Sequence, residues 1–291
     1  MKKTIIFTFA GRRENMELQI PFMTRILVKN PDVVWHIWNL TGTDEDNEFL
    51  RSLGNDDFPH VAGQVKIFHS FHSGHMSWRR FNDVWRHYRS QQYKDYQFVK
   101  VDDDVVFIET DGFAGFAEAV RTNPDSVVSA MVINNGACTP LIPDLQATAF
   151  EPLDIPLLDV HLHGAFALLS HEWFLGQWQD VVDGGDELLE TTDWLSINFI
   201  GMSYRMLHRI TSAIGKRQTG PIAGRDFPNG RIGDEGAANI FPRLVYRGLV
   251  AGHLTFGPQV EGPYQLTPDD WNHLRQWYAK AAAEYLEVPE E

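Results

Sequence analysis

The chain has 291 residues, of which 43% are hydrophobic and 22% are charged, and its formal net charge is −14. This acidic balance disfavours broad adhesion to nucleic acid or to an anionic membrane, because both surfaces are bound by clustered Lys and Arg. The composition is that of a globular protein long enough to bury a substantial core.

Neither a disulfide nor a membrane segment is expected. Cys138 is the single cysteine, so no intramolecular disulfide can form. No segment approaches the roughly 20 continuous apolar residues of a transmembrane helix. The apolar stretch at residues 4–10 also lacks a convincing signal-peptide cleavage site. We therefore expect a soluble, cytoplasmic protein.

Strand-like and helix-like segments alternate through the first 133 residues. Apolar runs predict strands at 3–9, 33–39, 65–68, 98–101, 105–108 and 126–133. Helical spacing predicts helices at 14–27, 44–53, 77–88 and 112–121, the third of them capped by Ser77. Such repeated β-α-β units predict an α/β fold, with a mostly parallel central sheet that helices cover on both faces.

The remainder of the chain has a less regular pattern. Its Pro, Asp and Asn content predicts a long loop at 134–160. The later segments predict a strand at 161–170, helices at 190–209 and from Asp234, a strand at 248–256 and a closing helix at 267–286. No internal repeat or low-complexity linker interrupts the sequence, so we expect one domain over residues 1–291.

Three adjacent aspartates, Asp102, Asp103 and Asp104, directly follow a predicted strand. In extended backbone Asp102 and Asp104 project to one side and Asp103 to the other. Two carboxylates on one side can share Mg²⁺ or Mn²⁺, which prefer oxygen ligands. The alternative is a solvated turn, or aspartates that cap the following helix. In a parallel sheet, ligands bind at the carboxyl ends of strands, so the position favours the metal hypothesis.

Four segments resemble landmarks of one family. "FVKVDDDVVF" (98–107) is similar to the DXD segment of metal-dependent GT-A fold glycosyltransferases, especially to the "KTDDDVFV" form of inverting β-1,3-glycosyltransferases. "HLHGAFALLS" (161–170) resembles the glycine-containing strand after that segment. "RIGDEGAANIF" (231–241) resembles the acidic segment where the catalytic base often lies. "GLVAGHLTFGP" (248–258) resembles the C-terminal strand whose histidine is often a metal ligand.

The resemblance implies a Rossmann-like GT-A fold and a role for each matching residue. Residues 1–133 would form a nucleotide-binding half and 134–260 an acceptor-binding half, followed by a C-terminal helix in 261–291. Mn²⁺ or Mg²⁺ would be held by Asp102, Asp104 and His253. Asp234, or else Glu235, would be the catalytic base. The donor nucleotide would contact Phe9, Ala10, Gly11, Arg12, Arg80, Asp102 and Asp103.

The expected reaction moves a sugar from a nucleoside-diphosphate sugar, with UDP favoured, to an acceptor hydroxyl, with inversion favoured over retention. The acceptor stays open between a glycan, a protein, a small molecule and a modified nucleic-acid base, and no pattern indicates an oligomeric state. One alternative is a sugar-phosphate nucleotidyltransferase, although "FAGRREN" matches its Gly-rich, Lys-containing signature poorly. The other alternative is a non-catalytic protein that binds a nucleotide or glycan.

Overall fold

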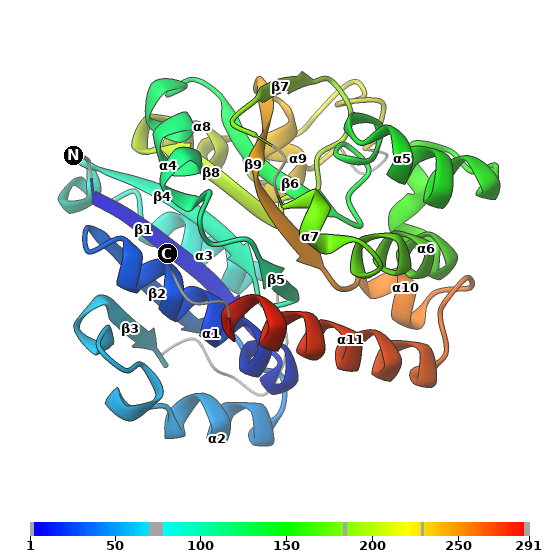
Figure 1. The fold of residues 1–291 in the computed structure, drawn as a ribbon. Helices are drawn as coiled ribbons and strands as arrows, with labels where there is room; N and C mark the ends of the chain where they lie inside the picture. The colour runs from blue at the N-terminus through cyan, green and yellow to red at the C-terminus, as the bar shows by residue number, and fades with distance from the viewer. Residues whose placement is uncertain (1–2, 70–77, 183–184, 228–229, 288–291) are drawn as a thin grey trace.

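The computed structural model describes residues 3–69, 78–182, 185–227 and 230–287. In these ranges the chain forms a nine-stranded sheet with helices packed on it (Figure 1). In chain order its strands are β1 (Lys3–Ala10), β2 (Val33–Asn39), β3 (Val65–Phe68), β4 (Tyr96–Asp102), β5 (Val105–Ile108), β6 (Val127–Ile133), β7 (Leu188–Thr191), β8 (Phe199–Ser203) and β9 (Arg243–His253). Their spatial order is β3-β2-β1-β4-β8-β6-β9-β5, and β7 also pairs with β9.

The helices are α1 (Arg13–Lys29), α2 (Asp44–Ser52), α3 (Trp78–His87), α4 (Phe113–Thr122), α5 (Pro143–Leu145), α6 (Gly164–Leu175), α7 (Trp178–Val181), α8 (Tyr204–Ala213), α9 (Asp234–Asn239), α10 (Gly257–Glu261) and α11 (Pro268–Glu287). Short 3-10 or π turns occupy Asn55–Asp57, Ala62–Gln64, Gln91–Tyr93, Thr139–Leu141, Gln146–Phe150, Glu151–Leu153 and Leu157–Leu162. Among the described residues, no helix combines the length and the apolar character needed to cross a bilayer.

Strand β1 is buried on both of its faces. Ile6 belongs to the core that α1 covers, whereas Phe7 points to the opposite core and lies 5.4 Å, ring to ring, from Trp85 of α3. Successive side chains of a strand alternate between faces, so a strand covered on both sides reads as a continuous apolar run. Burial of each such side chain contributes about 1.5–3 kcal/mol.

The strand directions confirm the α/β class and show that the sheet is mixed. β1, β2, β3 and β4 are mutually parallel. β8 lies between β4 and β6 and is antiparallel to both. β9 is parallel to β6, while β5 and β7 are antiparallel to β9. Most strands therefore share one direction, as expected, but the sheet is not purely parallel.

The predicted strand at 161–170 is wrong, because α6 begins at Gly164 and continues to Leu175. The segment is apolar all round, so its pattern does not separate a buried strand from a buried helix. Its Ala and Leu residues are good helix formers. Its buried positions, among them Gly164, Ala167, Ser170 and Phe174, recur every three or four residues, which is the spacing of one helix face.

Two further expectations need correction. The predicted helix at 190–209 is instead β7, β8 and only the beginning of α8. β8 is short and fully buried, and such a strand lacks the polar alternation by which a sequence reveals it. The predicted loop at 134–160 contains α5 and several single-turn helices. Ser77, expected to cap α3, lies outside the described residues.

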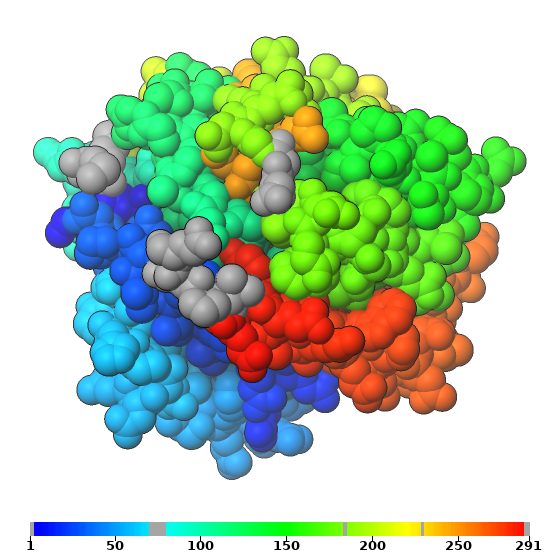
Figure 2. Space-filling view, viewed as in Figure 1, coloured from blue at the N-terminus to red at the C-terminus, as the bar shows by residue number. Residues whose placement is uncertain are grey.

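The closing helix α11 ties together segments that are far apart in the chain. It crosses the surface between the N-terminal segment and the segment that contains α6 and α7 (Figure 2). The hydroxyl of Tyr278 lies 2.8 Å from Nδ1 of His171 in α6. The hydroxyl of Tyr285 accepts a 2.8 Å hydrogen bond from the backbone N–H of Thr110.

Candidate metal and substrate site

The acidic turn and His253 meet because two strands pair. Asp102 is the last residue of β4, and Asp103 and Asp104 form the turn into β5. His253 ends β9 and pairs with Val105 at the start of β5. The backbone N–H of Leu254 donates a 2.7 Å hydrogen bond to the carbonyl of Asp104, which fixes the two segments side by side.

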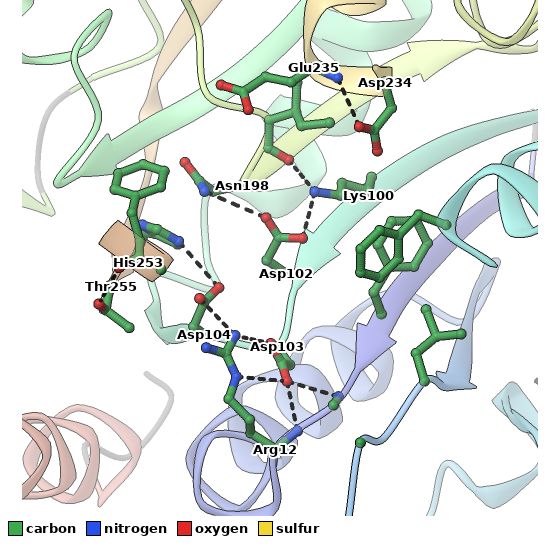
Figure 3. A pocket seen from close by; sticks show the side chains of 18 of the residues that line it. Arg12, Lys100, Asp102, Asp103, Asp104, Asn198, Asp234, Glu235, His253 and Thr255 are labelled. Carbon is green, nitrogen blue, oxygen red and sulfur yellow. Dashed lines mark hydrogen bonds and ion pairs between the residues drawn. The ribbon is translucent and has the colours of Figure 1, made fainter. Parts of the chain in front are cut away.

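One potential ligand atom from each of Asp102, Asp104 and His253 lies within 4.8 Å of the others. The predicted convergence of these three side chains is therefore confirmed, and the group could hold a metal ion (Figure 3). Asp104 and His253 are buried, whereas Asp102 is partly open to the cavity described below.

The fit of a divalent cation rests on an orphaned oxygen. Oδ1 of Asp104 is buried and has no hydrogen-bond partner among the described residues, and it lies 3.2 Å from Nε2 of His253. A buried carboxylate oxygen without a partner is costly. Neighbouring ligands of an octahedral ion with bonds of about 2.1 Å are about 3 Å apart. The 3.2 Å between Asp104 and His253 is close to this spacing, so the group could hold a divalent cation.

The second oxygen of Asp104 is paired. Oδ2 accepts a 2.7 Å hydrogen bond from the guanidinium of Arg12. Burial acts to raise the pKa of Asp104, but Arg12 and His253 outweigh it and hold that pKa well below its usual value. Asp104 is therefore a carboxylate, the form that binds metal.

Asp103 lies in a turn and not in extended backbone, and it shares the Arg12 guanidinium with Asp104. Its carboxylate accepts hydrogen bonds from the backbone N–H groups of Gly11 and Arg12, each at 2.9 Å, and from the Arg12 side chain. These bonds clamp the loop that joins β1 to α1 onto the acidic turn. The contacts support a role for Asp103 in shaping the nucleotide loop predicted from the sequence.

Asp102 is paired with a lysine that the sequence analysis missed. Lys100 lies two residues earlier on the same face of β4, and its ammonium is 2.5 Å from Oδ1 of Asp102. Asn198 lies 3.5 Å from Oδ2 of the same carboxylate. Burial raises the pKa of Asp102 to about 6, although Lys100 acts in the opposite direction. A lysine inside an apolar strand was the signal that could have revealed this pair.

A cavity of about 540 Å³ opens beside the acidic turn, within the roughly 300–1,000 Å³ of small-molecule sites. One end is aromatic, where the rings of Phe9 and Phe81 stack at 5.0 Å. Gly11 and Arg12 also line the cavity. Ala10 is buried within β1.

Two residues from the predicted nucleotide site stand apart from the cavity wall. Neither Ala10 nor Arg80 belongs to the described residues that line the cavity. Ala10 contributes through its backbone instead, because its carbonyl accepts a 2.9 Å hydrogen bond from the N–H of Leu40, which does line the cavity.

The opposite wall carries Asp234 and Glu235 at the start of α9 (Figure 3). Both oxygens of Asp234 are engaged: Oδ2 accepts from the indole of Trp85 at 3.0 Å, and Oδ1 accepts from the N–H of Glu235 at 3.0 Å. Oε1 of Glu235 accepts from the indole of Trp194 at 2.5 Å. Oε2 of Glu235 accepts no hydrogen bond from the described residues. Burial raises the pKa of Glu235, and the Trp194 hydrogen bond partly opposes this.

Sequence reasoning missed both indoles. Trp85 was expected only as part of an apolar helix face, and Trp194 fell inside the wrongly predicted helix at 190–209. Their N–H groups reach the carboxylates through contacts 149 and 41 residues apart in the chain, and no local pattern reports such contacts.

No protein-family model matches the chain, and no curated protein matches it in sequence.

Proposed function

We propose that this protein is a metal-dependent glycosyltransferase that moves a sugar from a UDP-sugar to an acceptor hydroxyl, with inversion. The observation that carries the proposal is the buried Oδ1 of Asp104, which has no hydrogen-bond partner by geometry in the described part of the chain and lies 3.2 Å from Nε2 of His253, beside Asp102 at the rim of a cavity. The opposite wall of the same cavity carries a carboxylate with one unengaged oxygen, that of Glu235. A cation site and a proton acceptor across one cavity are what transfer from a nucleoside-diphosphate sugar requires.

Asp102, Asp104 and His253 would hold the Mn²⁺ or Mg²⁺. When bound, such an ion supplies positive charge that neutralises a diphosphate leaving group. Arg12 is a weaker substitute, because Nε and Nη2 of its guanidinium are already bound to Asp103 and Asp104. The cavity has few other cations, so nucleotide binding should depend strongly on the metal.

The aromatic end of the cavity suits the nucleoside. Phe9 and Phe81 offer ring surface for a base, and the Gly11–Arg12 backbone is fixed by Asp103. Gly11 presents no side chain, which allows close approach of a ribose or phosphate. This arrangement supports the nucleotide site expected after the first strand.

Glu235 is the better candidate for the base, although the sequence placed Asp234 first. Asp234 uses both oxygens in hydrogen bonds, whereas Oε2 of Glu235 accepts none from the residues that the structure describes. Burial raises the pKa of Glu235, which makes its carboxylate a stronger base. Glu235 would take the proton of the acceptor hydroxyl as that oxygen bonds to the anomeric carbon and the bond from carbon to diphosphate oxygen breaks.

Calorimetry tests the binding half of this proposal. Titration of the full chain with UDP in Mn²⁺ should show binding that disappears in EDTA, because the diphosphate is held through the ion. Absence of metal-dependent UDP binding would overturn the proposal.

Transfer or hydrolysis of UDP-sugars tests the catalytic half. Glu235→Gln should abolish turnover while the Kd for UDP with Mn²⁺ stays unchanged. Asp234→Asn is the matched control and should retain most of the activity. Equal activity of Glu235→Gln and the native chain would remove Glu235 from the mechanism.

A further inference from the structure

Lys100 places a buried ammonium on the floor of the cavity. The residue is only 3% exposed, yet it lines the cavity. Its Nζ donates to the carbonyl of Ile197 at 2.8 Å and lies 2.5 Å from Oδ1 of Asp102. An ammonium has three N–H donors, so one remains without an acceptor in the described part of the chain.

The ammonium of Lys100 has an aromatic ring on one side and a carboxylate on another. The ring of Phe9 lies 5.4 Å from Nζ on one side, and the carboxylate of Asp102 lies on another. A buried ammonium with an unused N–H is costly, which makes the cavity beside it a favourable position for an oxygen acceptor of a ligand.

The position of Lys100 identifies which part of a ligand it would meet. In Figure 3 its ammonium lies between Asp102 on one side and the wall of Asp234 and Glu235 on the other. In the proposed reaction the diphosphate lies by the metal ligands and the attacking hydroxyl lies by Glu235. The anomeric carbon must lie between them, so the group beside Lys100 is the transferred sugar.

On this basis we propose that Lys100 donates a hydrogen bond to an oxygen of the transferred sugar and thereby helps to select the donor. The inference rests on the proposed function and adds a residue and a ligand chemistry to it. The oxygen that accepts this hydrogen bond belongs to a hydroxyl or to a carboxylate of the transferred sugar. A sugar that presents an ammonium at this position is disfavoured by charge repulsion.

The test compares UDP with UDP-sugars, because UDP lacks the group that Lys100 would contact. The Kd values of the native full chain and of Lys100→Met are measured with Mn²⁺ for UDP, UDP-glucose, UDP-galactose, UDP-N-acetylglucosamine and UDP-glucuronate. The native chain should bind at least one UDP-sugar more tightly than UDP. Lys100→Met should reduce that preference by roughly 10- to 150-fold, the worth of a charged hydrogen bond. The largest loss for UDP-glucuronate would indicate a carboxylate, and the largest loss for a neutral sugar a hydroxyl.

A purely structural role of Lys100 has a different signature. If Lys100 only neutralises Asp102, Lys100→Met changes the affinities for UDP and UDP-sugars by the same factor, and the inference is overturned. A native chain that binds no UDP-sugar more tightly than UDP overturns it as well. In both cases metal-dependent UDP binding persists, so the proposed function still stands. Loss of that binding from the native chain would instead contradict the proposed function itself.

Two further variants guard the experiment. Lys66→Met removes an exposed lysine of β3 that does not line the cavity, and it should leave all five affinities unchanged. Lys100→Arg keeps a cation beside Asp102 if Lys100→Met does not fold. It displaces the N–H donors, so the ratio of UDP to UDP-sugar affinity should still change, and an unchanged ratio would contradict the inference.

Discussion

Trp194 and Glu235, 41 residues apart in the sequence, are joined by a 2.5 Å hydrogen bond from the indole N–H to Oε1. The guanidinium of Arg225 lies over the same indole, 4.4 Å from the ring centroid. Trp194 is only 7% exposed, so its orientation is fixed by packing. The indole thus holds one oxygen of Glu235, and the other oxygen accepts no hydrogen bond within the described ranges.

Removing this hydrogen bond should impair the base without removing it. Trp194→Phe leaves the carboxylate less well oriented, and we expect kcat for sugar transfer to fall by about tenfold with little change in KM for the donor. The N–H also stabilises the ionised form of Glu235, so its loss raises the pKa of this residue. The rise of kcat with pH should therefore move to higher pH.

The control for this variant is Trp277→Phe, which changes an indole on the exposed face of α11. Its kinetics should match those of the native chain. An unshifted pH profile for Trp194→Phe would show that the indole does not tune Glu235.

Asp103 and Asp104 are adjacent in sequence but should differ in their response to substitution. Asp104→Asn removes the charge of a candidate metal ligand, so the increase in Tm that Mn²⁺ gives to the native chain should disappear. Asp103→Asn weakens the charge-assisted bonds to the Gly11–Arg12 loop and should lower stability by about 1.5–3 kcal/mol. The increase in Tm by Mn²⁺ should survive in Asp103→Asn. Thermal unfolding with and without Mn²⁺ measures both effects, and loss of the metal response in both variants would contradict the separation of roles.

Two buried histidines should make the fold sensitive to acid. Burial lowers the pKa of His171 to about 3 and that of His36 to about 4, whereas an unfolded histidine titrates near 6.5. Between these values the unfolded chain binds protons that the folded chain does not, so unfolding is favoured as the pH falls. At pH 5 each histidine should cost about 2 kcal/mol relative to neutral pH.

Urea unfolding between pH 5 and 7.5 measures this slope. In His171→Gln the free energy of unfolding should change less with pH, because one histidine fewer binds a proton on unfolding. The variant should also be less stable overall, because His171 bonds to Tyr278 and to the Leu254 carbonyl. An unchanged slope would show that His171 is not the group that titrates.

Gly201 on β8 should tolerate no side chain. A Cβ at this position would lie 2.2 Å from Cγ2 of Val120 and 3.1 Å from the ring of Phe116, both in α4. Gly201→Ala should therefore destabilise the protein by about 1–3 kcal/mol through overpacking. Gly63→Ala is the control, since no atom lies within 4 Å of its added Cβ. Urea unfolding compares the two, and equal stability would show that α4 can shift away from the sheet.

The first half of the fold follows from local pattern. β1, β2 and β3 are apolar runs bounded by polar loops, and α2 begins where Thr43 accepts a hydrogen bond from the N–H of Asp46. Burial on both faces makes such strands recognisable in sequence. In the second half the same patterns gave wrong predictions at α6 and β8, because a uniformly apolar segment has no period that separates helix from strand.

The sequence by itself indicated the acidic turn, since three aspartates after an apolar strand predict carboxylates that can share a cation. The family resemblance added His253 and the acids at the start of α9. Only the tertiary structure decided which of these side chains have partners. Pairing of β5 with β9 sets His253 against Asp104, the strand β4 aims Lys100 at Asp102, and Trp85 and Trp194 leave Glu235 rather than Asp234 with an open oxygen. These side-chain pairings join residues that are distant in the chain, so they form only once the sheet has folded.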